Sequence, residues 1–267
     1  DMGIAGAAWA TIIGQIISGI MVLIYLSHFK TVKIGKEQLK PDFEHFGKIA
    51  ALGTAPCFNQ LAMMVVQIAL NNVLTHYGAS SSYGSDIPLA CAGIITKVNM
   101  IFFSFNIGIS QGLQPIISFN YGADKLARVK EAYLKATAAA TIISTAAFLC
   151  FQLFPRQIIG IFGSESEAYF QFAERFFRIY LFCTFINGIQ PITSNFFTAI
   201  GKASRGVFIS LTRQIIFLLP LMLILPMFMG IDGVMYSAPI ADAIAAFFAI
   251  TFAAKELKKY PSLKKSV

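Results

Sequence analysis

The sequence predicts an all-α integral membrane protein with about seven transmembrane helices, and three observations carry that prediction. Hydrophobic residues make up 56% of the 267 residues, and mean hydropathy is +0.67. Charged residues make up only 13%, whereas an ordinary soluble domain carries roughly 25%. The charges also lie in short groups that separate long stretches without Asp, Glu, Lys or Arg. This patterning excludes a disordered chain and disfavours a soluble domain.

Seven stretches are long enough to cross a bilayer as helices. A helix rises about 1.5 Å per residue, so roughly 20 apolar residues span the hydrocarbon core. In lipid every backbone N–H and C=O needs a partner within the chain, which favours helices, and the alternation typical of β-barrel strands is absent. The predicted spans are residues 4–27, 48–76, 88–119, 131–154, 170–197, 207–229 and 232–254.

Basic residues predict which side of the membrane each loop occupies. Residues 30–48 hold five, residues 124–135 hold four, residues 199–206 hold two and the tail 255–267 holds five. The alternate loops hold one, Arg156. Because basic loops stay in the cytoplasm, this asymmetry predicts a multi-pass protein of the cell (inner or plasma) membrane with a cytoplasmic C-terminus. Seven spans then put the start outside, and the first residue is Asp rather than Met, so we expect a missing upstream part.

Two short repeats predict an internal duplication. Met-Gly-Ile-x-Gly occurs at residues 2–6 and again at residues 229–233, opening the first and the last predicted span. The same offset places Gln15 opposite Asp242. The simplest explanation is a duplicated bundle of six helices, as in many transporter folds, of which this chain holds one complete copy and the helix before it. The alternative is a chance turn sequence.

The second repeat, Gly-x-Gln-Pro-Ile-x-Ser, occurs at residues 112–118 and 188–194. Proline removes one backbone hydrogen bond and kinks a helix, and nearby polar groups can satisfy the freed carbonyl. These sites are either hinges and cavity walls or bends set by packing. The hinge candidates are Pro56, Pro115 and Pro191.

Several stretches together resemble the multidrug and toxic compound extrusion (MATE) transporters, in order along the whole chain. They are Gln111–Pro115 with Asn120–Ala123 and Arg128–Lys130, Ala199–Lys202, Ser210–Gln214 with Pro220, and Pro239–Asp242. The resemblance implies twelve helices in two six-helix lobes around a V-shaped cavity. It also implies secondary active export of drugs and organic cations in exchange for H⁺ or Na⁺, with no cofactor besides the coupling ion.

The resemblance also assigns the parts of the chain. Residues 1–29 would be the last helix of the N-lobe, residues 30–46 a cytoplasmic linker between the lobes, residues 47–254 the C-lobe bundle, and residues 255–267 a basic cytoplasmic tail. The implied partners are the lipid bilayer, small organic cations and the missing N-lobe of the same polypeptide. The sequence is closest to the bacterial branch whose acidic coupling site lies in the first helix.

This chain departs from relatives that bind a cation in the C-lobe. Those relatives carry carboxylates in helices seven and ten, whereas the candidate positions in the corresponding spans here hold amides, such as Asn59, Asn71 and Asn187. A sodium site of that type is therefore disfavoured in this lobe.

Asp242 is the one acid deep inside a predicted span, and Arg213 lies at a comparable depth in the preceding span. Carboxylates within a membrane face a cavity or a partner. The two residues are candidates either for ion coupling or for a structural pair, and we favour the pair. Lys97 is the other cation deep in a predicted span. In a cation exporter its positive charge would repel the substrate, so we expect it to gate the cavity or to pair with another residue rather than to bind substrate.

Polar residues within the spans are candidates for the wall of a substrate cavity, although such residues also hold helices together. The cavity candidates are Asn59, Gln67, Asn71, Lys97, Gln111, Gln114, Asn187 and Gln190.

Other functions fit the sequence less well. A flippase for lipid-linked saccharides would need several cations inside the spans to neutralise pyrophosphate, and a purely structural membrane subunit stays an alternative. The three histidines lie at span ends or in a loop, with no HExxH or GxSxG motif, which disfavours an enzyme. The four cysteines lie in apolar segments without metal-ligand spacing, and the scattered basic charge disfavours a nucleic-acid partner.

Overall fold

The computed structural model of the chain describes residues 3–28, 43–81, 83–162 and 166–261, and contains no β-strand among them. The chain divides into two compact units, residues 1–53 and residues 54–267. In the first unit, α1 (Gly3–Ser27) exposes every residue from Ala8 onward. An apolar helix that buries none of its surface within its own unit requires lipid or another helix around it. Most of the predicted linker 30–46 lies outside the described residues.

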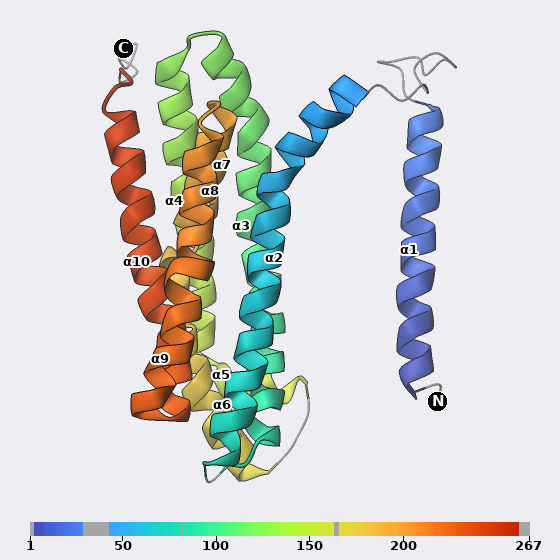
Figure 1. The fold of residues 1–267 in the computed structure, drawn as a ribbon, viewed down its shortest axis with the longest axis vertical. Helices are drawn as coiled ribbons and strands as arrows, with labels where there is room; N and C mark the ends of the chain where they lie inside the picture. Colours follow the sequence, from blue (N-terminus) through green and yellow to red (C-terminus); the bar gives the residue numbers. More distant parts are fainter. Residues whose placement is uncertain (1–2, 29–42, 82, 163–165, 262–267) are drawn as a thin grey trace. The chain divides into compact units, whose positions relative to one another are not determined.

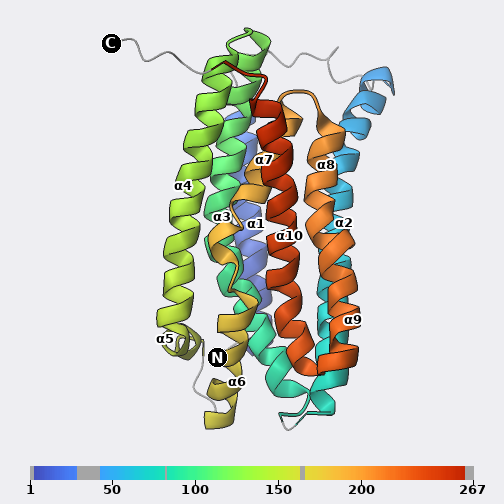
Figure 2. The same cartoon turned by 90° about the vertical axis from the view of Figure 1, so that its left-hand side faces the viewer.

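The second unit is a helical bundle. Figure 1 and Figure 2 show its long helices lying lengthwise beside one another, with α5 and α6 at the end opposite the C-terminus. Its elements are α2 (Phe43–Ala79, from residue 54), α3 (Asp86–Gly122), α4 (Leu126–Leu153), α5 (Pro155–Gly160), α6 (Glu167–Tyr180), the 3₁₀-helix η2 (Thr184–Ile186), α7 (Ile189–Ala199), α8 (Ala203–Leu211), the π-helix η3 (Thr212–Leu218), α9 (Leu219–Met229) and α10 (Ile231–Leu257).

Six helices of the described part are long and apolar enough to cross a membrane. They are Ala8–Ser27, Cys57–Ala79, Asp86–Gly122, Leu126–Leu153, Ala203–Met229 and Ile231–Leu257. Each overlaps a predicted span and differs from it by a few residues at most ends. The all-α membrane fold is therefore confirmed, and long charge-free stretches were a sufficient signal for these six elements.

The continuous helix predicted over residues 170–197 is wrong. The structure divides this stretch into α6, η2 and α7. Pro191 fits the start of α7, because proline has no N–H to donate, but proline alone does not cause the break, since Pro115 lies inside the continuous α3 and α6 already ends at Tyr180. Pro191 lies in the first turn of α7, where an N–H needs no partner within the helix.

Two hydrophobic clusters form the core of the bundle. One joins α2, α3, α4, α6 and α10 around large side chains such as Leu74, Phe151 and Phe176. The other joins α3, α4, α7 and α10 around Ile117 and Phe196. α10 contributes buried alanines to both, and their small side chains let its backbone approach its neighbours closely.

The repeated Met-Gly-Ile-x-Gly motif has a structural reason at its second occurrence. Gly230 adopts a φ of +59°, which an L side chain rarely adopts, and it ends α9. A Cβ at Gly233 would lie 2.5 Å from the carbonyl carbon of Leu225, so α9 and α10 meet too closely for any side chain there. The first occurrence begins at Met2, outside the described residues, so the duplication stays a prediction.

Candidate functional site

Arg213 and Asp242 form an ion pair inside the bundle. Arg213 Nε donates to Asp242 Oδ1 at 2.5 Å, and the two side chains are 18% and 3% exposed. Asp242 lies in the middle of α10, whereas Arg213 lies in the π-helix η3. A π-helix inserts an extra residue into a helical turn, which shifts the direction of its side chains, and such turns are frequent at functional sites. The two charges neutralise each other at a position where the Asp242 carboxylate is buried.

Gln190 bonds to the same helical run as Arg213. Its Nε2 donates to Ile209 O at 3.1 Å and lies 3.5 Å from Ser210 O. These two carbonyls lie just before the π-helix that carries Arg213. The Gln190 side chain, which is 9% exposed, therefore links α7 to the end of α8 and contributes to helix packing.

The polar residues predicted on α2 and α3 form exposed stripes. Gln67 Nε2 donates to Asn71 Oδ1 at 3.1 Å, and both side chains are exposed on α2. Lys97, Ser104 and Gln111 are spaced by seven residues and are exposed on α3. A spacing of seven returns to the same face of a helix. No acid among the described residues lies within ion-pair distance of Lys97.

The remaining candidates are partly or fully buried. Asn59 Oδ1 accepts from Ser210 Oγ at 2.6 Å, which ties α2 to α8. Gln114 is half-buried in α3, and Asn187 is buried between η2 and α7. The structure therefore brings Gln67 and Asn71 together as exposed side chains, whereas Asn187 and Gln190 are buried.

The hinge candidates occupy different positions. Pro115 lies inside α3, which continues through it to Gly122. Pro191 lies at the break before α7, as described above. Pro56 lies in α2, in a stretch whose side chains are outside the described residues.

A buried polar layer surrounds the break between α6 and α7. Asn106 Nδ2 donates to Ser144 Oγ at 2.8 Å, and Asn106 Oδ1 accepts no hydrogen bond from a described residue. This layer lines a space of about 10 Å³ together with Thr184 and Asn187. Such a space is at the lower limit for one water molecule.

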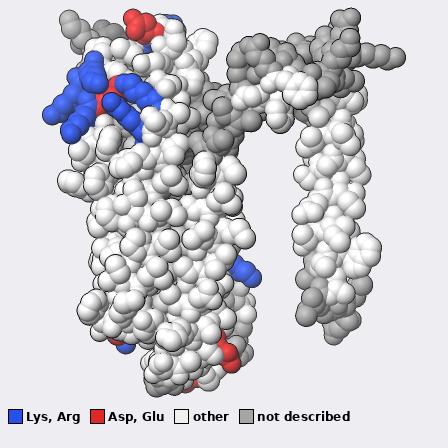
Figure 3. All heavy atoms as spheres, in the orientation of Figure 1, with Lys and Arg blue, Asp and Glu red and all other residues white. Residues whose placement is uncertain are grey.

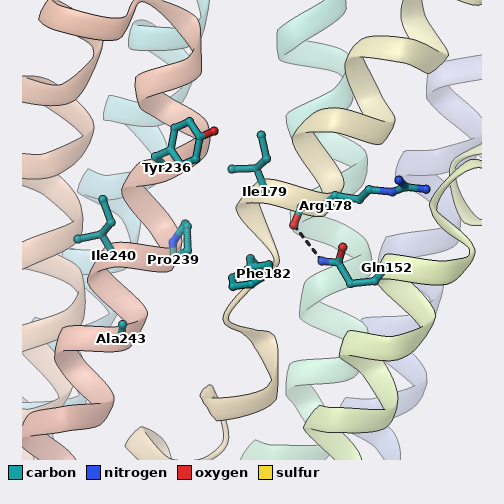
Figure 4. Close-up of a pocket in the computed structure, with 8 residues that line it drawn as sticks. All are labelled: Gln152, Arg178, Ile179, Phe182, Tyr236, Pro239, Ile240 and Ala243. Atoms are coloured by element: carbon teal, nitrogen blue, oxygen red, sulfur yellow. Dashed lines mark hydrogen bonds between the residues drawn. The ribbon is translucent and has the colours of Figure 1, made fainter.

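An apolar cavity of about 480 Å³ lies between α4, α6 and α10. Phe182, Pro239 and Ile240 are among the residues that line it, and Figure 4 shows the guanidinium of Arg178 pointing away from α10. Gln152 Nε2 donates to the Arg178 carbonyl at 2.9 Å, so its amide is already engaged. None of the predicted site residues lines this cavity, and its lining contains no acid.

The family comparison decides what kind of protein carries these features. The MatE family model matches residues 55–224, well over half of the chain. The chain belongs to the MatE family. This membership confirms the resemblance to MATE transporters that the sequence motifs indicated.

Among curated MatE relatives, two multidrug export proteins named MepA are 24% identical to the chain over 253 residues. They come from Staphylococcus aureus (strain bovine RF122) and Staphylococcus saprophyticus. The match covers 94% of this chain and 53% of each relative, so the chain spans about half the length of these relatives.

Solved MATE structures share the fold. A multidrug resistance MATE family transporter in its outward-facing conformation superposes with a TM-score of 0.82 at 20% identity, over 96% of this chain and 57% of that one. A MOP superfamily transporter from Pyrococcus furiosus superposes with a TM-score of 0.81 at 19% identity, with the same coverage. The chain therefore has the fold of one part of a MATE transporter.

Hydrogen bonds around α7 of this MatE chain involve hydroxyl residues that are not among the predicted cavity, pair or hinge candidates. Ser110 Oγ donates to Pro191 O at 2.8 Å, and Tyr133 Oη lies 2.8 Å from Thr193 Oγ1. Ser194 Oγ donates to Gly206 O at 2.7 Å. The sequence pattern that could have indicated these bonds is a set of small hydroxyl residues beside a proline motif. Such residues can donate to backbone carbonyls where two helices pack closely.

Proposed function

We propose that the chain is the C-lobe, with the preceding helix, of a transporter that exports drugs or organic cations by antiport with H⁺ or Na⁺. Residues 1–29 then end the N-lobe, residues 30–46 link the lobes, residues 47–254 form the C-lobe, and residues 255–267 are the basic tail. MatE membership is the observation that carries this proposal. The MepA relatives, named as multidrug export proteins, support the substrate class.

The exposed stripes on α2 and α3 would form one wall of the substrate cavity. Polar side chains on a membrane-crossing helix are unfavourable against lipid, so they face a cavity or another helix. Gln67, Asn71 and Gln111 offer neutral dipoles, and Met63 and Phe105 add exposed apolar surface beside them. Adaptable apolar residues with uncharged polar groups suit binding of varied organic cations.

The coupling carboxylate would lie in the other half of the transporter. Antiport needs a group whose occupancy by an ion changes the affinity for substrate. In proton-coupled pumps this group is usually a carboxylate. The one acid deep in this lobe, Asp242, is held by Arg213. This carboxylate already has a charged partner within the lobe, which favours a structural role for the pair.

A vesicle assay tests this function. The full-length polypeptide that contains the chain is reconstituted, a pH or Na⁺ gradient is imposed, and movement of a fluorescent lipophilic cation is followed. We expect gradient-driven transport by the full-length protein and none by residues 1–267 alone. Transport by both at comparable rates would overturn the division of roles, and transport by neither under either gradient would overturn the antiport proposal.

A matched pair of variants tests the cavity wall. Gln67→Leu combined with Asn71→Leu removes the polar stripe on α2, and we expect slower transport with unchanged folding. Ile68→Leu is the control, because Ile68 is exposed on the same helix beside the stripe. Equal transport by both variants would remove α2 from the cavity.

The flippase alternative is not favoured. Pyrophosphate would require several cations free to face a cavity. Arg213 is neutralised by Asp242, and Arg175 NH2 bonds Asp232 at 2.8 Å. Lys97 alone would leave most of the substrate charge uncompensated.

A further inference from the structure

Three basic side chains converge on one buried carboxylate where α10 ends. Glu256 is 3% exposed and lies in the last turn of α10. Its Oε1 accepts a short hydrogen bond from Lys202, and its Oε2 lies 3.2 Å from Arg205 NH1 and 3.3 Å from Lys259 Nζ. These four residues are called the Glu256 cluster below.

The Glu256 cluster carries an excess of positive charge. One carboxylate against three cations leaves two charges uncompensated. The basic side chains are 33%, 48% and 61% exposed for Lys202, Arg205 and Lys259, so their charged ends remain accessible. Figure 3 shows the basic atoms gathered around acidic atoms near this end of α10.

The other ion pairs of the described residues differ in this balance. Arg213 meets one acid, Arg175 meets one and Lys135 meets one. Arg156 meets two, Glu167 and Glu174. The Glu256 cluster is thus the one group in this part of the chain with more bases than acids, and it attracts anions where the others do not.

Glu256 also gives the cluster a defined geometry. It holds Lys202 and Arg205 at the start of α8, where no side chain caps the helix. The first N–H groups of a helix carry partial positive charge and point along its axis, so they reinforce the attraction for an anion there. Two long side chains fixed by a shared carboxylate lose less conformational freedom on binding than free surface lysines do.

Apolar surface continues directly from the charged ends. Phe208 lies three residues after Arg205, on the same face of α8, and is 42% exposed. Both residues belong to the candidate span Ala203–Met229. A ligand that meets Arg205 with an anionic group can therefore lay a hydrocarbon chain against Phe208.

We propose that the Glu256 cluster is a binding site for the phosphate of an anionic membrane phospholipid, whose acyl chain lies along Phe208. Basic groups next to membrane-spanning helices recognise anionic lipid head groups, which are concentrated at that depth. The site is separate from the cavity wall proposed on α2 and α3, and it does not depend on the substrate or the coupling ion. It places a specific lipid against the contact between α8 and α10.

Lipid retention measures the site directly. The chain is extracted from nanodiscs of phosphatidylcholine mixed with phosphatidylglycerol, and the retained lipids are counted by native mass spectrometry. Arg205→Gln with Lys259→Gln removes the two excess charges and keeps Lys202 on Glu256. Each basic residue near an anionic membrane surface changes the affinity for anionic lipid by about fivefold. We therefore expect the preference for retaining phosphatidylglycerol over phosphatidylcholine to fall by roughly tenfold or more. The control, Lys125→Gln with Lys135→Gln, removes equal charge outside the cluster and should change retention little.

Each other result would overturn the proposal. Equal losses in the two double variants would mean diffuse attraction to basic charge rather than a site. Unchanged retention in the cluster variant would place the lipid elsewhere. Displacement of phosphatidylglycerol by inorganic phosphate at an equal phosphate concentration would mean that the acyl chain plays no part. If circular dichroism shows that the double variant folds poorly, the single variant Lys259→Gln is compared with Lys125→Gln under the same criteria. Lys259 is the most exposed of the three bases, so this change disturbs folding least.

Discussion

Arg213 Nε donates to Asp242 Oδ1 at 2.5 Å, and this contact joins the π-helix η3 to the middle of α10. Neither partner has another charged residue within ion-pair distance among the described residues. Each therefore depends on the other, since an isolated charge inside a membrane bundle is strongly unfavourable.

Asp242→Asn should destabilise the lobe by about 3–5 kcal/mol, because the Arg213 charge stays buried without a partner. Adding Arg213→Gln should recover part of the loss, which identifies direct coupling between the two residues. Thermal unfolding in detergent and the expressed amount of folded protein measure both effects. Normal folding of Asp242→Asn together with loss of pH-dependent efflux would instead favour ion coupling at Asp242.

Gln190→Leu should destabilise the bundle by about 1–3 kcal/mol, because the Ile209 carbonyl loses the amide that donates to it. The matched control is Gln114→Leu, at the same position of the other Gly-x-Gln-Pro repeat. Gln114 is half-buried, and we expect a change within about 0.5 kcal/mol. Thermal unfolding of both variants in one detergent gives the comparison, and equal effects would contradict the assigned role of Gln190.

Gly233→Ala should lower stability by about 1–3 kcal/mol, because the added methyl group would lie 2.5 Å from backbone atoms of Leu225. Gly112→Ala is the control, since a Cβ there has no atom within 4 Å apart from the nearby backbone of its own helix, and alanine favours a helix. Melting temperatures should therefore move in opposite directions or at least separate clearly. A neutral Gly233→Ala would show that α9 and α10 are not held together this closely.

The basic asymmetry of the loops predicts opposite accessibility for two introduced cysteines. In a background without the four native cysteines, Ser81→Cys should react with an impermeant thiol reagent added outside intact cells. Ser262→Cys should react only after the cells are permeabilised. The opposite pattern would reverse the predicted sidedness of every loop.

Arg156 and Glu167 predict a small pH dependence at the α5–α6 connection. Two hydrogen bonds from Arg156, at 3.1 and 2.7 Å, lower the pKa of Glu167 below its usual value. A carboxyl whose pKa falls on folding adds stability above its unfolded pKa, and this contribution disappears as pH falls through the folded value. Arg156→Gln should thus reduce the loss of stability seen on acidification below about pH 4.5. Identical acid unfolding curves would show that this exposed pair contributes nothing.

Sequence patterns alone determined six membrane-crossing helices, the family and the Arg213–Asp242 pair. Length and hydropathy are local properties, and lipid forces an apolar stretch without charges to satisfy its own backbone as a helix. The pair followed from a similar principle, since two opposite charges at one depth in neighbouring helices have few other partners. Gly188 and Pro191 are residues that could have indicated the break in the helix predicted over residues 170–197. The repeat that contains them was interpreted as a kink instead.

Only the tertiary structure decided which polar residues are exposed and which hydrogen-bond or ion-pair partner each one has. Gln190 and Gln114 occupy equivalent positions of a repeated motif, yet of the two only Gln190 donates to a backbone carbonyl of another helix, that of Ile209 in α8. Glu256 was a single acid in a basic tail until Lys202 and Arg205, more than 50 residues away, were brought to it. Backbone conformation depends mainly on near neighbours in the chain, whereas a buried polar side chain is defined by partners from distant segments, which a local pattern does not contain.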